Sequence, residues 1–184
     1  MRLLLLLSCL ALAACASSGT APQATDTSNV GAARQMLAAQ SRGGPVPLVV
    51  AGPTGGRTAS RVGIEAGRGV RGLAVRFVPM PPVAGQGRLV LWFDPPAATT
   101  SDVVCSRLNG SSVAEGTPSS LTAVWCVDDK PVAEVNGSIE GTGADQVDRL
   151  VWRSTSRLFP DDYQDTYGFN LFGNRVNFGG WFGL

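Results

Sequence analysis

The stretch Val46–Ser60, VPLVVAGPTGGRTAS, passes from an apolar run into a glycine-rich turn and then into Gly-Arg-Thr. A short, continuous apolar run that is bounded by turn residues predicts a buried strand. Thr58 and Ser60 are candidate caps of a following helix, because their hydroxyls can accept hydrogen bonds from its first N–H groups. A strand-turn-helix-strand order therefore fits, although three glycines between residues 61 and 69 each weaken the helix by about 1 kcal/mol.

The same turn resembles a phosphate-binding loop. Residues 51–58, AGPTGGRT, have the spacing of G-x-x-x-x-G-K-[ST], with Ala51 in place of the first glycine and Arg57 in place of the lysine. An apolar run later leads into Asp94, as the magnesium-binding strand of such enzymes does. However, Pro53 lacks an N–H donor, and an arginine fork is not equivalent to the lysine. A degenerate P-loop NTPase is therefore the most remote function that we consider.

The N-terminus, MRLLLLLSCLALAACASS, has one positive charge, then an apolar core, then small residues that end in cysteine. This order is typical of a secretory signal of about 14 residues, which is too short to span a membrane. Residues 12–15, Leu-Ala-Ala-Cys, resemble the lipobox of bacterial lipoprotein precursors, which implies cleavage before Cys15 and acylation of Cys15. A match at Cys9 leaves too short an apolar core. The remaining alternative is an ordinary secretory signal that is cleaved nearby without lipidation.

In that family the residue after the cysteine influences sorting, and Ala16 is not the aspartate that commonly retains such proteins in the inner membrane. For a Gram-negative bacterium, the resemblance implies a protein on the periplasmic face of the outer membrane. Its several acyl chains would provide the stable anchoring that a single chain does not. We expect the membrane, reached through this anchor, as one partner, and an envelope protein or an anionic lipid as another.

Composition limits the chemistry. The net charge is +1, and removal of residues 1–14 changes it to 0 because only Arg2 is lost; we therefore expect no nucleic-acid partner. The sequence has no histidine, which excludes Ser-His-Asp and Cys-His catalysis and histidine-ligated metals, and we expect no metal and no other cofactor. Cys105 and Cys126 remain after export, and such a pair in an oxidising compartment predicts a disulfide. The alternatives are two separate buried thiols and, less commonly, a metal-binding pair.

Positive charge is concentrated in one part of the chain. Residues 57–88 contain six arginines and a single acid. A G+C-rich genome explains the general preference for arginine over lysine, but not this uneven placement. We take the first four arginines as a candidate site for lipid phosphate or another anionic envelope component. These residues are Arg57, Arg61, Arg68 and Arg71.

The chain divides into four parts: the signal at 1–14, a segment at 15–29, a domain at 30–162 and a tail at 163–184. Residues 15–29 are small and polar, which is typical of a flexible tether. The domain is long enough for one core. The tail has seven of the thirteen aromatics among five glycines, and it either packs over the core or forms an exposed docking patch. The candidate interface residues are Phe169, Phe172, Phe178, Trp181 and Phe182.

Two further helices are predicted, at residues 30–41 and from residue 142 to Pro160. In the first, Ala33, Met36 and Leu37 share one side. In the second, residues 142 and 145 match a capping box, and the proline ends the helix. The predicted core face of the second helix is Val147, Leu150, Val151, Ser154 and Leu158.

The remaining pattern predicts strands. They lie at residues 46–51, 73–78, 88–93, 101–108, 121–127 and 131–139, with the last two joined as a hairpin. This order predicts the α+β class: a single two-layer domain with a mainly antiparallel sheet, helices on one face, and one disulfide between neighbouring strands or at their margins.

We expect a lipid-anchored cell-envelope protein that is not an enzyme and that works by binding or scaffolding, in outer-membrane assembly, maintenance or lipid transport. The alternative is a periplasmic cell-wall hydrolase that uses carboxylates as acid and base. Its candidate carboxylates are Asp161, Asp162 and Asp165, which follow a helix-ending proline. A solvated loop or an adventitious calcium site is the commoner outcome for such a cluster.

Overall fold

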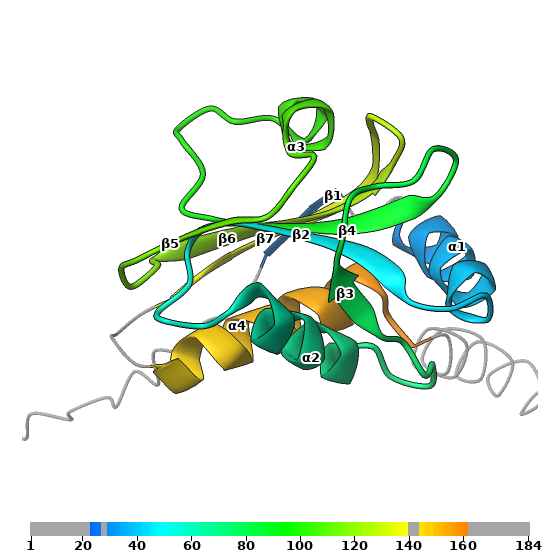
Figure 1. Cartoon of the computed structure of the whole chain (residues 1–184), viewed down its shortest axis with the longest axis horizontal. Helices are drawn as coiled ribbons and strands as arrows, with labels where there is room; N and C mark the ends of the chain where they lie inside the picture. Colours follow the sequence, from blue (N-terminus) through cyan, green and yellow to red (C-terminus); the bar gives the residue numbers. More distant parts are fainter. Residues whose placement is uncertain (1–22, 27–28, 140–143, 162–184) are drawn as a thin grey trace, which may run out of the picture.

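The computed structural model describes residues 23–26, 29–139 and 144–161. In this part of the chain one sheet separates helices on its two faces (Figure 1). The elements in chain order are β1 (Gln23–Asp26), α1 (Val30–Ser41), β2 (Val46–Pro53), α2 (Ala59–Gly69), β3 (Phe77–Pro79), β4 (Gly87–Phe93), α3 (Ser101–Arg107), β5 (Ser112–Ala114), β6 (Ser120–Val127), β7 (Lys130–Ser138) and α4 (Ala144–Leu158).

The sheet is mixed. Its strand order is β1-β7-β6-β4-β2-β3, and β5 pairs with the end of β2. Neighbouring strands are antiparallel in the part β1-β7-β6-β4. Strand β2 is instead parallel to β4, β3 and β5. The β2–β3 pair is parallel because β2, α2 and β3 form a crossover unit, which is the strand-turn-helix-strand order that the sequence indicates. The α+β class and the single domain are confirmed, but the sheet is less antiparallel than predicted.

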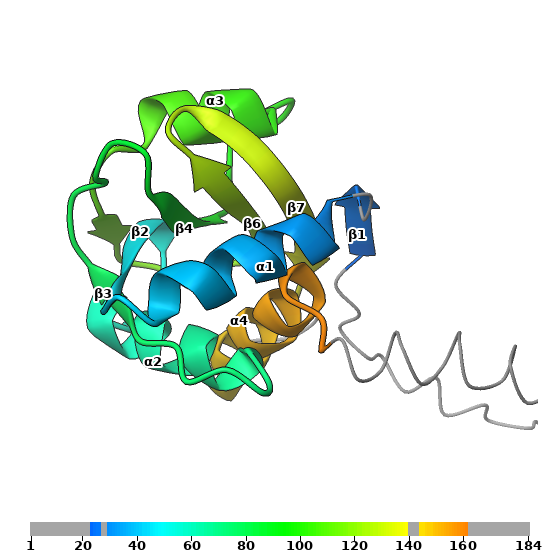
Figure 2. The same cartoon turned by 90° about the vertical axis from the view of Figure 1, so that its right-hand side faces the viewer.

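Helices cover both faces of the sheet rather than one. Helices α1, α2 and α4 lie on one face, and α3 lies on the other (Figures 1 and 2). Residues 101–107 form this helix, so the strand predicted at residues 101–108 is wrong. Its two buried residues, Val104 and Cys105, are adjacent in sequence. Adjacent positions fit one side of a short helix, whereas a strand would turn them to opposite faces.

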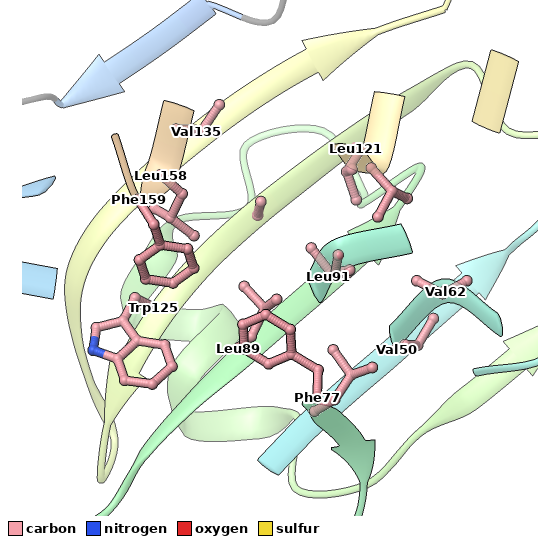
Figure 3. Close-up of a cluster of buried hydrophobic side chains, with 14 of the residues drawn as sticks. Val50, Val62, Phe77, Leu89, Leu91, Leu121, Trp125, Val135, Leu158 and Phe159 are labelled. Carbon is pink, nitrogen blue, oxygen red and sulfur yellow. The ribbon is translucent and has the colours of Figure 1, made fainter. Parts of the chain in front are cut away.

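The main core lies between the sheet and the three helices of the first face (Figure 3). Trp125 of β6 meets the ring of Phe159 edge to face, with 5.4 Å between the ring centroids, a geometry that aromatic pairs favour. All five residues predicted for the core face of α4 are buried, which confirms the helical pattern there.

Helix α1 is correctly placed, but one of its predicted core residues is not. Ala33 and Leu37 are buried, whereas Met36 is 44% exposed. The buried polar residue on this helix is Arg34, whose guanidinium donates to the carbonyl oxygens of Phe159 at 3.1 Å and Arg71 at 2.8 Å. An apolar pattern does not indicate such a residue, because its burial depends on carbonyl groups that other elements supply.

The sheet begins and ends with short edge strands. Strand β1 lies within the segment at residues 15–29 that is predicted to be a tether, and it pairs with β7 through Gln23 opposite Asn136. The sheet therefore begins before residue 30. At the other edge, the strand predicted at residues 73–78 forms only at Phe77–Pro79, because it pairs with just the first three residues of β2. None of the helices in the described ranges is long and apolar enough to span a membrane.

Candidate functional site

The glycine-rich turn lies at the carboxyl end of β2, between this strand and α2. In open sheets with parallel strands, ligands often bind at this end, where the chain crosses from one side of a strand to the other. Here β3 flanks β2 on one side and β4 on the other. Gly55 and Gly56 adopt positive φ angles of 63° and 79°. Thr58 then caps α2, because its side chain accepts a hydrogen bond from the Arg61 N–H.

The polar groups of this turn bind to one another and to a neighbouring loop. The buried Thr54 hydroxyl donates to the Arg57 carbonyl oxygen at 2.5 Å, and the Arg57 N–H donates back to the Thr54 carbonyl at 3.3 Å. The Gly55 N–H donates to the Gly116 carbonyl at 2.9 Å. In a phosphate-binding loop such N–H groups point at the ligand. In this loop one of them closes the turn upon itself, and the other binds the neighbouring loop.

Arg57 occupies the lysine position of the phosphate-loop spacing, but its charge is directed at α4. Its Nε and Nη2 atoms each donate to a different oxygen of Asp148, both at 3.0 Å. This bidentate hydrogen bond, with the charge of Asp148, raises the pKa of Arg57 above its usual value. A guanidinium that is held in this way joins the turn before α2 to α4.

Asp94 follows β4 beside the turn, as a magnesium ligand would, but its Oδ1 atom already binds two serines. Oδ1 accepts hydrogen bonds from the N–H and hydroxyl groups of Ser119 and Ser120, at 2.8–3.0 Å. Burial alone raises the pKa of Asp94, but these hydrogen bonds outweigh it and hold the pKa below its ordinary value. Among the described residues no three His, Cys, Asp or Glu side chains are close enough to hold a metal ion.

The other predicted anion-binding arginines also have partners. The Glu65 carboxylate, which is almost fully buried, is 2.7 Å from Arg61 and 2.9 Å from Arg68. Arg71 lies over the ring of Trp152, 5.4 Å from its centroid. Arg57 and Arg61 both approach Asp148, at 3.0 and 3.8 Å. The four arginines thus extend from the turn before α2 to just beyond its end, and contacts within the domain balance much of their charge.

The predicted disulfide joins Cys105 to Cys126, with 5.7 Å between the Cα atoms. It connects α3 to β6, and not two strands as expected. Both cysteines are fully buried in the second core, between the sheet and α3. The disulfide therefore fastens to the sheet a helix that is too short to be stable alone.

A buried arginine that the sequence analysis did not single out supports this disulfide. Arg88 is opposite Cys126 in the sheet and only 2% exposed. Its guanidinium donates to the carbonyl oxygens of Cys105 and of Asp128. The sequence signal for this residue is a single arginine at the start of an apolar strand. Such an arginine is buried only where other elements supply carbonyl acceptors for its guanidinium, and the sequence does not show these acceptors.

Several sequence predictions fall outside the described residues. They are the lipidation site Cys15, the carboxylates Asp162 and Asp165, and the aromatic residues Phe169, Phe172, Phe178, Trp181 and Phe182. Of the three candidate catalytic carboxylates, only Asp161 is described, and it lies 3.7 Å from Arg34.

Two open grooves border helices α1 and α2. The larger, of about 580 Å³, lies between the end of α1 and the start of β4. The Gln40 side chain crosses its base through hydrogen bonds to the N–H and carbonyl groups of Gly87, both at 2.8 Å. Apolar side chains and backbone form most of its wall, without any ionisable residue. The smaller groove, of about 380 Å³, runs between α2 and residues 73–77.

The comparisons with known proteins give no match to a family model, to a curated protein or to a solved structure.

Proposed function

We propose that this chain is exported and lipid-anchored through Cys15, and that its domain works by binding or scaffolding on the periplasmic face of the outer membrane. The tasks that fit are outer-membrane assembly, maintenance and lipid transport. The observation that carries the proposal is the buried Cys105–Cys126 disulfide. Disulfides of this kind form in oxidising compartments and are rare in the cytosol. The lipobox resemblance at residues 12–15 is independent support from the sequence.

A binding or scaffolding role is supported by the way the charged side chains are used. The arginines of α2 are paired with Glu65 and Asp148, and the Asp94 carboxylate is held by two serines. Groups held in this way stabilise the packing of elements. General acid–base catalysis instead requires a titratable group within reach of the substrate proton.

Labelling with radioactive palmitate tests the anchor. Wild-type protein should incorporate the label, and Cys15→Ala should abolish incorporation because the acylated sulfur is gone. Cys9→Ala is the matched control, because it removes the other cysteine of the signal region and should leave labelling unchanged. Equal labelling of wild type and Cys15→Ala would refute lipidation at this residue.

The binding role requires an experiment of its own. Cross-linking in intact cells, followed by mass spectrometry, should capture one recurrent envelope protein or lipid on the wild-type domain. If purified protein instead releases fragments from peptidoglycan, and acid-to-amide variants lose that activity, the scaffold proposal is wrong and the hydrolase is right.

A further inference from the structure

Helix α4 carries opposite charges on its two flanks. The acids lie toward α2, where Asp148 binds Arg57 and Asp145 adds to the electrostatic attraction on the same guanidinium. The three arginines of the helix are spaced four residues apart, which places them along one side. This arginine flank consists of Arg149, Arg153 and Arg157.

Two of the three arginines on this flank differ from Arg61 and Arg68 of α2, because their charges are not paired with a carboxylate of the described residues. Arg149 and Arg157 are exposed, and neither forms an ion pair with any of the described residues. Like charges four residues apart weaken a helix, so the spacing brings no gain in stability. An external anion would supply the missing compensation.

The position of the flank is set by the sheet. Helix α2 packs against α4 and lies over β2 and β3, whereas α4 lies over β6 and β7. The flank of α4 that is turned away from α2 therefore faces the side of the domain where β7 and β1 form the edge (Figure 2). The chain joins the domain at the same edge, because Gln23 is the first residue of β1.

Chain length links this edge to the membrane, and here the inference rests on the proposed anchoring at Cys15. Gln23 is eight residue steps from Cys15 (23 − 15), and eight steps can span at most about 29 Å. Residues 16–22, ASSGTAP, carry no charge, so they do not neutralise the flank. A connection of this length keeps the β1 edge within about 29 Å of the bilayer, so the domain can reach the region within about 10 Å where anionic headgroups attract cations.

We propose that Arg149 and Arg157 of this flank lie against the acidic phospholipid headgroups of the membrane that holds the anchor. Guanidinium groups bind phosphate in a bidentate manner, and arginine is suited to this contact. The contact fixes one orientation of the domain, with the β1 edge toward the bilayer. The arginines of α2 are not needed for it, because Arg57, Arg61 and Arg68 are already paired with carboxylates.

Arginine footprinting tests the contact on the anchored protein. The full-length processed chain is reconstituted into vesicles of phosphatidylcholine, with or without phosphatidylglycerol, and treated with phenylglyoxal before mass spectrometry. Arg149 and Arg157 should react several-fold more slowly on the vesicles that contain phosphatidylglycerol, and high salt should remove this protection. Arg42, at the end of α1, and Arg107, on α3, are both exposed. They should react at the same rate on the two kinds of vesicle.

A matched pair of variants separates a specific contact from general attraction. Arg149→Gln should reduce the protection of Arg157 by about fivefold, because each basic residue near an anionic surface contributes a similar share of the attraction to that surface. Arg42→Gln removes the same charge elsewhere and should leave that protection unchanged. The contact is refuted if Arg149 and Arg157 react equally on both kinds of vesicle, or if Arg42 and Arg107 are protected to the same degree.

Flotation of the same samples judges the anchor separately. A lipidated chain should float with vesicles of phosphatidylcholine alone, because acyl chains need no anionic lipid. If the chain does not float with them, anchoring is refuted. Protection of Arg149 and Arg157 on phosphatidylglycerol vesicles still decides the contact in that case.

Discussion

The Asp94 carboxylate fastens the end of β4 to the start of β6 by accepting four hydrogen bonds from two successive serines. Its backbone φ of 46° lies in the left-handed region, where asparagine is also well tolerated. Asp94→Asn therefore removes the charge with little added backbone strain. Hydrogen bonds to a charged group contribute more than neutral ones, but partial exposure reduces their value. We expect the variant to lose about 1–2 kcal/mol in urea unfolding near pH 7.

The same variant has a defined pH dependence. The folded pKa of Asp94 lies below its ordinary value of 3.8, so the carboxylate stabilises the fold fully above that value. The contribution is lost as pH falls through the lower folded pKa. The difference between wild type and variant should therefore shrink in acid. Glu115→Gln is the control, because this side chain is exposed and forms no ion pair with any of the described residues, and the change should alter stability by less than about 0.5 kcal/mol. A constant difference for Asp94→Asn down to strongly acidic pH would contradict the assignment.

Gly52, near the end of β2, and Gly56, in the turn that follows, require glycine to different degrees. Both have positive φ, 87° and 79°, but a Cβ at Gly52 would lie 2.1 Å from the Phe93 carbonyl oxygen, whereas one at Gly56 would meet nothing within 4 Å. Gly56→Ala should cost about 1–2 kcal/mol for the backbone conformation alone. Gly52→Ala should cost at least about 2 kcal/mol more in urea unfolding, because β2 and β4 must separate. Equal losses would mean that the close approach to Phe93 is unimportant.

At the scale of elements, α3 depends on its disulfide. The helix has seven residues, of which only Val104 and Cys105 are buried, and such a short helix is unstable without tertiary contacts. The Cys105→Ala/Cys126→Ala double variant should lose about 3 kcal/mol of unfolding free energy in the chain-entropy estimate. Hydrogen exchange should increase in α3 before it increases in β4 or β6, because the sheet keeps its main core.

The control for this experiment is Ser106→Ala. Ser106 is exposed on the same helix, with its hydroxyl bonded to the carbonyl oxygen of Asp102, and its removal should leave the exchange of α3 nearly unchanged. If α3 in the double variant remains as protected as β6, then the disulfide does not hold the helix to the sheet.

The glycines of α2 show where local reading of the sequence is incomplete. By propensity alone, Gly63 and Gly67 are expected to weaken the helix. The structure adds that a Cβ on them would lie 2.7 Å from the Phe77 carbonyl oxygen and 2.9 Å from that of Val75. The glycines thus let α2 pack directly against the strand that follows it. This packing depends on the crossover between β2 and β3, which a local propensity does not contain.

Elements with a long period or a long apolar run were predictable, whereas short ones were not. Helices α1 and α4 and strands β2, β4, β6 and β7 have such patterns, and their positions are confirmed. The short helix α3 and the short edge strand β3 were missed or overextended, since a few residues carry too little pattern to separate the two states. The parallel pairing of β2 with β4 depends on the order of the strands in the sheet, which no single segment encodes.

The candidate site was predictable only in its residue types. The sequence indicated the arginine-rich segment and the glycine-rich turn, but Arg57 pairs with an acid 91 positions away. Arg34 and Arg88 turn inward to carbonyl oxygens of distant elements. The disulfide was predictable because the compartment and the cysteine count suffice to infer it.

At the scale of the whole molecule, β1 protects the edge of β7. Without β1 the longest strand of the sheet, Lys130–Ser138, would present unpaired N–H and carbonyl groups, which favour pairing with a second chain. A chain that begins at residue 29 should therefore be less stable by about 1–3 kcal/mol, for the loss of a few backbone hydrogen bonds. It should also form dimers at high concentration. A chain that begins at residue 20 keeps β1 and serves as the control. Urea unfolding and light scattering measure both effects, and identical behaviour of the two chains would show that β7 needs no cover.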